Sequence, residues 1–223
     1  VDRIFLFDSH GLVTKDREGL TPLKQKFAHE QEPQSTFLDA IGEVKPTAIV
    51  GCAAQAGSFN AYVLSAMARI NERPIIFALS NPTSRSECTA REAYTYTEGK
   101  CLFASGSPFP QVEVNGKTFI PRQSNNSYVF PGIGLGLVVS SPRIVPQSVF
   151  LSAAEALSKI VSEDDLENGS LFPSLTKIRE VSQSIAAAVA EQCFTAGVAG
   201  VPKPDDLSKA IQEAMYKPVY DRI

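Results

Sequence analysis

The sequence predicts an α/β fold, in which a mostly parallel sheet carries helices on both faces and is followed by a helical segment. Two observations support this prediction. Up to about residue 125, short apolar runs alternate with helical patterns in the order β-α-β-α-β-α-β, which is typical of parallel strands joined by crossover helices. After Pro131 the strand-like runs stop and long helical patterns replace them. The change in composition between residues 125 and 132 is therefore the expected boundary between two lobes.

The expected strands of the first lobe are short apolar runs that end on small or polar residues: 3–7, 47–52, 74–79 and 101–104. Helices are expected over residues 36–44 and 60–70, because apolar side chains recur there at helical spacing. A third helix begins after Thr89, since Thr89 and Glu92 fit a capping box. Residues 112–120 alternate around Asn115-Gly116, which is the strongest short hairpin signal.

The second lobe is predicted to be helical over residues 147–161, 178–194 and 205–216. A glycine-rich run before these helices superficially resembles a phosphate-binding loop, but it stays apolar and favours close helix packing; its glycines are Gly132, Gly134 and Gly136. An acidic run follows Ser162, which indicates a solvated helix N-terminus rather than a metal site; it consists of Glu163, Asp164 and Asp165.

Composition argues against several classes of function. The 223 residues carry a net charge of −3 with scattered Lys and Arg, so nothing indicates binding of nucleic acid or of a membrane surface. No apolar run approaches the roughly 18 residues of a membrane span, and no signal-peptide pattern is present. The four cysteines lack C-x-x-C spacing, which indicates free thiols rather than a zinc site. Because the chain starts at Val1, we expect it to be processed or cut from a longer polypeptide.

Polar residues directly after two expected strands form the best candidate site. Residues 80–83 (S-N-P-T) follow one apolar run, and residues 105–108 (S-G-S-P) follow the next. Ligands of open α/β sheets bind outside the carboxyl ends of parallel strands. Pro82 biases Asn81 toward an extended backbone and prevents continuation as a central strand. Asn81 is therefore expected to point into a crevice.

Two further features of the first lobe have both a functional and a structural interpretation. Asp8, after the first expected strand, could accept from a cofactor ribose or could cap a turn. Residues 51–59 follow a strand and open a helix, so Gly51 and Ala53 could line a cofactor site or belong only to a tight turn.

The same ambiguity holds for two pairs of polar residues. Asn125 and Asn126 are typical of a turn, but side-chain amides can also hold a carboxylate and a nicotinamide carboxamide. Lys24 and Lys26 lie in a polar stretch, where solvated surface is the ordinary interpretation.

Several multi-residue blocks, in this order, resemble malic enzymes. The blocks are F-D-S-H-G-L (7–12), F-A-H-E (27–30), N-E-R-P (71–74), F-A-L-S-N-P-T (77–83), E-C-T-A (87–90), residues 94–99, F-A-S-G-S-P-F (103–109) and N-N-S-Y-V-F-P-G (125–132). The resemblance covers essentially the whole chain. It implies a Rossmann-type NAD(P)-binding domain over residues 1–125, a helical segment of the substrate-side domain over 126–197, and a C-terminal helix within 198–223 that returns to the cofactor domain.

The resemblance also implies an activity, the oxidative decarboxylation of L-malate to pyruvate and CO2 with NADP or NAD and with Mg²⁺ or Mn²⁺. Asn81 and Asn125 match family positions that contact malate, and Asn81 also contacts the nicotinamide. Asp8 matches the acidic residue near the adenine ribose. Ser9 and Lys24 match positions that accommodate a 2′-phosphate, which needs positive charge and donors, so NADP is favoured over NAD.

Other residues of the family pattern are expected outside the chain. The catalytic Tyr and Lys, the malate-binding arginine, the three acidic metal ligands and the phosphate-binding glycine loop would lie upstream of Val1. No catalytic or metal-binding residue is therefore expected here, and the chain alone is expected to be inactive. One departure lies within the chain, where Arg122 replaces the glycine that precedes Gln123 in the family pattern.

Two alternative functions stay open at this point. One is malolactic enzyme, which converts malate to lactate, and the other is a non-catalytic nucleotide-binding module. The resemblance suggests a homo-oligomer, either a dimer or a tetramer. A cytoplasmic location is expected, without exclusion of an organelle.

Overall fold

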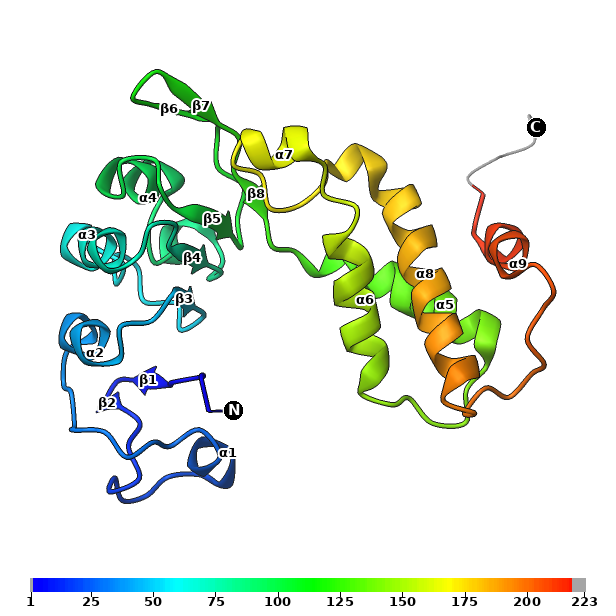
Figure 1. Ribbon diagram of the computed structural model, residues 1–223, viewed down its shortest axis with the longest axis horizontal. Coiled ribbons are helices and arrows are strands. Elements are labelled where there is room, and N and C mark those ends of the chain that lie inside the picture. The colour runs from blue at the N-terminus through cyan, green and yellow to red at the C-terminus, as the bar shows by residue number, and fades with distance from the viewer. Residues whose placement is uncertain (1, 218–223) are drawn as a thin grey trace. The chain divides into compact units, whose positions relative to one another are not determined.

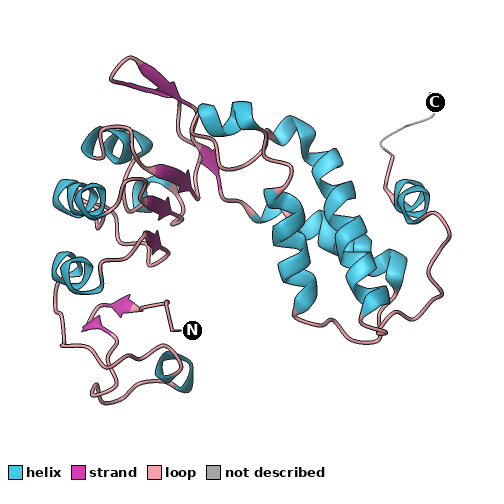
Figure 2. Ribbon diagram, in the orientation of Figure 1, coloured by secondary structure: helices cyan, strands magenta, loops and turns pink. Residues whose placement is uncertain are grey.

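The computed structural model describes residues 2–217 and divides into two compact units between Pro121 and Arg122. The first unit combines strands and helices, and the second is helical (Figures 1 and 2). None of the helices within residues 2–217 has both the length and the apolar character needed to cross a bilayer. Each unit has its own core of buried apolar side chains.

The first unit is built on three parallel strands, β3 (Ala48–Gly51), β4 (Ile75–Ala78) and β5 (Leu102–Ser105). The short strand β8 (Arg122–Gln123) lies at the start of the second unit. In the register of the sheet, one row of directly paired side chains is buried; it consists of Ile49, Ile76 and Phe103. The predicted parallel sheet is confirmed.

Helices cover one side of this sheet within the described part of the first unit. α2 (Phe37–Val44), α3 (Ala61–Ile70) and α4 (Ala90–Tyr96) lie side by side along β3, β4 and β5 (Figure 1). The strands advance in one direction across the sheet, and right-handed crossovers then place successive helices on the same face. The expected cover on both faces is therefore not seen here.

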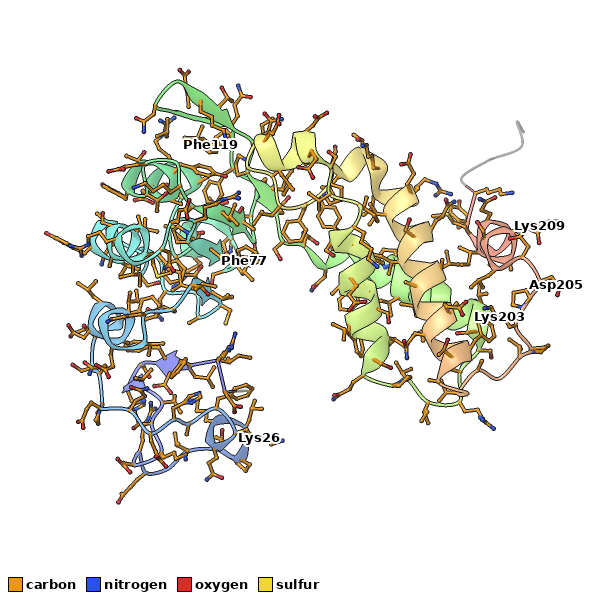
Figure 3. The ribbon with its side chains drawn as sticks, viewed as in Figure 1. Lys26, Phe77, Phe119, Lys203, Asp205 and Lys209 are labelled. Atoms are coloured by element: carbon orange, nitrogen blue, oxygen red, sulfur yellow. The ribbon has the colours of Figure 1, made fainter. Side chains whose placement is uncertain are left out.

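The other face of the sheet is apolar and partly open. Phe77 lies on the side away from the helices (Figure 3), and its neighbour in the register, Val50, is 56% exposed.

The first expected strand does not join this sheet, so the prediction of a parallel strand over residues 3–7 is wrong. β1 (Phe7–Asp8) pairs antiparallel with β2 (Gly11–Leu12) in a separate hairpin. The apolar run instead folds back on itself, because the N–H of Val13 donates to the carbonyl of Leu6. Gly11 allows this turn, since its φ is +101° and a Cβ would lie 2.3 Å from the Gln34 carbonyl oxygen.

Short elements complete the first unit. α1 (Pro22–Gln25) and a 3-10 turn, η1 (Thr83–Arg85), lie in loops. β6 (Val112–Val114) and β7 (Lys117–Phe119) form the predicted hairpin. Both turn residues, Asn115 and Gly116, have positive φ, as a type I′ turn requires.

The second unit packs its helices around α8 (Ile178–Thr195), which contacts α5 (Phe130–Ser140), α6 (Ser148–Ser158) and α9 (Leu207–Ala214). The shorter elements are η2 (Asn126–Tyr128), α7 (Glu163–Glu167) and η3 (Leu175–Lys177). The predicted close helix packing at the glycine-rich run is confirmed, because a Cβ at Gly132 or Gly136 would lie within 3 Å of α8 atoms.

The last helix lies in the second unit. α9 packs against α5 and α8, and its Ile211 is buried. The expected return of residues 198–223 to the cofactor domain stays a prediction. Of that segment, residues 218–223 lie outside the described residues.

Candidate functional site

The carboxyl ends of β4 and β5 are joined by side chains. Asn81 follows β4, and its Oδ1 accepts from the Ser107 hydroxyl, which follows β5, at 2.6 Å. The Asn81 side chain is exposed, and its Nδ2 donates only a long bond of 3.4 Å to the Leu79 carbonyl oxygen. An amide nitrogen carries two hydrogens, so Asn81 keeps capacity to donate to a ligand. The sequence had indicated both strand ends, and the structure brings them together.

The end of β3 is tied to the same edge through Ser80. The N–H of Ala54 donates to Ser80 Oγ at 2.9 Å. The Ser80 hydroxyl in turn donates to a carboxylate oxygen of Glu87, and the Ser80 N–H donates to the other at 3.3 Å. Glu87 is 1% exposed. Sequence reasoning missed Glu87, because an isolated acidic residue before a helix gives no signal of burial.

Gly51, a predicted cofactor residue, has a structural reason to be glycine. It is buried at the end of β3, and a Cβ there would lie 2.4 Å from Glu87 Cγ. The missing side chain therefore makes room for the Glu87 side chain. Ala53, the other predicted residue of this loop, is exposed. Gly106 is similar to Gly51, because its Cβ would lie 2.1 Å from the Leu79 carbonyl oxygen.

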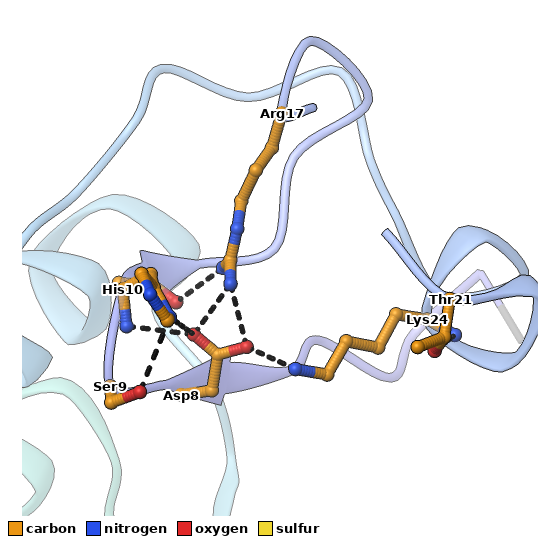
Figure 4. Close-up of polar contacts among 7 residues, drawn as sticks. Asp8, Ser9, His10, Arg17, Thr21 and Lys24 are labelled. Carbon is orange, nitrogen blue, oxygen red and sulfur yellow. Dashed lines mark hydrogen bonds and ion pairs between the residues drawn. The ribbon is translucent and has the colours of Figure 1, made fainter. Parts of the chain in front are cut away.

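Asp8 forms the centre of a charged cluster in the β1–β2 hairpin (Figure 4). Arg17 donates to both carboxylate oxygens, at 2.8 and 2.7 Å. Lys24 Nζ lies 2.5 Å from Oδ2, and the N–H of His10 donates to Oδ1 at 2.9 Å. A carboxylate offers about four lone-pair sites, so these donors fill them. Asp8 is thereby held between two cations, with one surplus positive charge in the cluster.

These contacts perturb the acidity of Asp8. The hydrogen bonds from Arg17, with smaller contributions from Lys24 and the His10 N–H, hold the pKa of Asp8 well below its ordinary value of 3.8. Partial burial opposes this effect, because desolvation disfavours the charged form. The side chains of Asp8 and Arg17 are 21% and 19% exposed, so the pair lies at the surface and remains accessible to a ligand.

The other two predicted residues near Asp8, Lys24 and Ser9, make different contacts. Lys24 lies on α1 and reaches Asp8, while Ser9 is exposed and its hydroxyl lies 3.2 Å from Nδ1 of His10. Arg17 was missed by the sequence analysis. It lies in a polar stretch with no periodicity, and only the fold of the hairpin brings it to Asp8.

Asn125, the second predicted substrate residue, belongs to the second unit. It is exposed, and its Oδ1 accepts from the N–H of Ser127 at 2.9 Å, which caps η2. Its Nδ2 makes no hydrogen bond in the part of the chain that the structure describes. The turn interpretation thus holds for the side-chain oxygen.

The described residues contain no group of side chains that could hold a metal ion by itself. Within residues 2–217, no three His, Cys, Asp or Glu side chains come together in a group that could bind one. The predicted helix cap at Ser162 is confirmed, since its hydroxyl and the Asp165 carboxylate form a capping box. No step is therefore assigned to Mg²⁺ or Mn²⁺ on these residues.

The first unit is thus an open α/β unit with polar side chains at the carboxyl ends of parallel strands, which is the arrangement of nucleotide-binding domains. Comparison with known proteins identifies the family to which the chain belongs. The chain belongs to the malic enzyme family: the family model described as malic enzyme, NAD binding domain, matches residues 1–194. The family resemblance seen in the sequence is confirmed.

Individual relatives agree with this assignment. A chloroplastic NADP-dependent malic enzyme of Zea mays is 49% identical over 220 residues, which are 98% of this chain and 35% of the relative. A mitochondrial NAD-dependent malic enzyme of Ascaris suum is 46% identical over all 223 residues and 35% of its own length. The chain therefore spans about a third of the curated relatives it matches.

Solved structures support the fold. A crystal structure of Entamoeba histolytica malic enzyme superposes with a TM-score of 0.69 at 23% identity, covering 96% of this chain and 43% of that one. A second structure, of malic enzyme from Pyrococcus horikoshii, gives a TM-score of 0.68 at the same identity, covering 91% of this chain and 42% of that one.

Proposed function

We propose that this chain is the cofactor-binding part of a malic enzyme, a longer polypeptide that converts L-malate to pyruvate and CO2 with NADP. The observation that carries the proposal is the family match over residues 1–194 together with the polar strand ends of the first unit. The chain contributes positioning of the substrate and the cofactor. Hydride acceptance is the chemistry that the bound nicotinamide supplies.

The charged cluster favours NADP over NAD. Arg17, Lys24 and the His10 N–H fill the acceptor sites of Asp8, which leaves Asp8 without a lone pair for a ribose hydroxyl. The cluster instead offers a surplus positive charge, and a 2′-phosphate forms strong charge-assisted bonds with such cations. In this role Asp8 orients Arg17 and Lys24, and Ser9 adds an exposed hydroxyl beside them.

The two asparagines are proposed to hold the substrate. The free donor capacity of Asn81 suits a malate carboxylate or the nicotinamide carboxamide. Asn125, in the second unit, has an exposed side-chain amide that also suits a malate carboxylate. Fixing the substrate against the nicotinamide lowers the entropic part of the barrier, which can amount to about 7 kcal/mol or more for well-oriented groups.

The proposal is tested by kinetics of the complete polypeptide that contains this chain. We expect malate-dependent formation of NADPH and pyruvate. Lys24→Met should raise KM for NADP about 10- to 100-fold, since a charge-assisted hydrogen bond contributes about 1.5 to 3 kcal/mol. KM for NAD should hardly change, because NAD lacks the phosphate.

Lys26→Met is the matched control. Lys26 is the C-cap of the same helix α1, is exposed, and makes no ion pair among the described residues (Figure 3). Equal effects of the two variants would contradict the assignment of Lys24 to the 2′-phosphate. Lactate in place of pyruvate would replace the proposal with malolactic enzyme, and absence of malate turnover would reject it.

The remaining expectations extend the proposal. A homo-oligomer and a cytoplasmic location stay predictions, and the relatives' names include chloroplastic and mitochondrial forms. Light scattering of the complete polypeptide and its localisation in cells would test them.

A further inference from the structure

We propose that Glu87 is a positioning residue, which holds the loops after β3 and β4 in one arrangement and so fixes the bound substrate relative to the cofactor. The inference rests on the proposed function. Its starting observation is the buried side chain of Glu87, which has no role in the proposed function.

Glu87 is buried without a cation. It is 1% exposed, and none of the ion pairs among the described residues involves it. Burial of a carboxylate is costly unless hydrogen bonds compensate. A buried acid held only by neutral donors is therefore an arrangement that packing alone would not favour.

The compensating bonds all come from the end of β4. The Ser80 hydroxyl donates to Oε1 of Glu87, and the Ser80 N–H donates to Oε2. The Ser80 hydroxyl has one proton, which it donates in the hydrogen bond to Glu87. The Ser80 oxygen also accepts from the N–H of Ala54, with a nitrogen–oxygen distance of 2.9 Å. The Ser80 hydroxyl therefore links the β3 loop to the Glu87 carboxylate.

Glu87 also contacts the β3 loop directly. Its carbonyl oxygen accepts from the N–H of Phe59 at 3.0 Å, at the end of the loop that Gly51 begins. Gly51 lacks a side chain where Glu87 passes. The loop that is proposed to face the cofactor is therefore held at Ala54 by the Ser80 side chain and at Phe59 by the Glu87 backbone, while Gly51 leaves room for the Glu87 side chain.

The same pair fixes Asn81. Ser80 precedes Asn81 in the chain, so the Ser80 N–H bond to Glu87 anchors the backbone, while Ser107 anchors the Asn81 side chain. A carboxylate suits this geometry better than an amide, because Ser80 presents two donors to two separate oxygens. A glutamine would offer one oxygen and one NH2 group, and the NH2 group would face a donor.

The test is kinetic and uses the complete polypeptide. Glu87→Gln keeps the volume and removes one acceptor. We expect kcat to fall at least about tenfold, because misplacement of reacting groups by about 1 Å costs on the order of 100-fold in rate. KM for malate and KM for NADP should rise together, because the Glu87–Ser80 pair is argued to hold both the Asn81 backbone and the β3 loop.

A second variant tests the inference in case Glu87→Gln does not fold. Ser80→Ala deletes the hydroxyl between Glu87 and Ala54 and should change kcat and both KM values in the same direction. The double variant should lose little more than the more affected single variant, since both act through one pair. Glu92→Gln is the control: its exposed carboxylate caps α4 by accepting from the Thr89 N–H at 2.8 Å, so only thermal stability should fall.

Two outcomes would overturn the inference. In one, Glu87→Gln lowers the melting temperature but leaves kcat and both KM values unchanged. In the other, Glu87→Gln does not fold and Ser80→Ala keeps wild-type kinetics. Failure of the wild-type polypeptide to oxidise malate would instead reject the proposed function.

Discussion

The first unit satisfies buried polar groups at its functional edge, whereas the second unit joins its main helices by apolar packing. At the strand ends, Ser80, Glu87 and Ala54 form a chain of hydrogen bonds. Between α5 and α8, glycines let the two backbones approach each other. Hydrogen bonds have preferred directions and can hold ligand-binding groups in place, while close packing is non-directional and supplies a rigid support.

Substitution of the helix glycines gives the largest expected effect. A Cβ at Gly136 would lie 2.7 Å from the Ala186 carbonyl oxygen on α8 and 2.9 Å from Val189 Cβ. Gly136→Ala should therefore reduce the free energy of unfolding of the second unit by about 1 to 3 kcal/mol, as overpacking does. Chemical denaturation monitored by circular dichroism would measure it.

Gly134 is the matched control on the same helix. It is exposed, and nothing lies within 4 Å of the position that a Cβ would occupy there. Gly134→Ala should stabilise by about 0.5 to 1 kcal/mol, because alanine is the better helix former. Equal destabilisation by both variants would show that the close approach of α5 and α8 is not what requires glycine.

Each unit contains a buried tyrosine hydroxyl, and substitution of these two tyrosines tests the comparison between the units. In the second unit, the Tyr128 hydroxyl donates to the Pro173 carbonyl oxygen at 2.6 Å. In the first unit, the Tyr94 hydroxyl is buried without a partner among the described residues, while its ring stacks on Phe119 at 4.2 Å. Tyr128→Phe should cost about 1 to 2 kcal/mol of unfolding free energy, because a buried carbonyl loses its donor.

Tyr94→Phe should be neutral or stabilising, because it removes a hydroxyl whose burial is not compensated. Thermal melts of both variants, followed by denaturant titration, would separate the two cases. A large loss of stability in Tyr94→Phe would mean that its hydroxyl has a partner after all, such as an ordered water.

The Asp8 cluster gives the smallest effect, and it depends on pH. The folded-state pKa of Asp8 is lower than its ordinary value of 3.8, so the cluster contributes stability above about pH 4. This contribution is lost as pH falls below 3.8 through the lower folded-state pKa. Because the pair is partly exposed, we expect Arg17→Met to cost only about 1 kcal/mol at neutral pH.

The Arg17→Met deficit should shrink toward zero in acid, and Asp8→Asn should abolish it at every pH. A double-mutant cycle from unfolding curves at neutral and at low pH would measure this. A deficit that stays constant with pH would contradict the ion pair as its cause.

Local signals predicted most of the elements correctly. The capping box at Thr89 and the turn at Asn115-Gly116 formed as expected, because both depend on residues within one turn of chain. The prediction of a parallel strand over residues 3–7 was wrong for a different reason. Its apolar composition fits any strand, and the partner was chosen by the turn at Gly11, which returns the chain on itself.

The sequence by itself determined the family, the parallel strands and the two strand ends that carry polar residues, since these follow from short motifs and periodicity. Only the tertiary structure decided that Arg17 neutralises Asp8 and that Glu87 lies buried beneath Ser80. These partners are separated by stretches with no repeating pattern. Their contacts arise from the geometry of loops, beside the β1–β2 hairpin for Arg17 and at the strand ends for Glu87. In such loops, backbone direction rather than residue spacing sets which side chains meet.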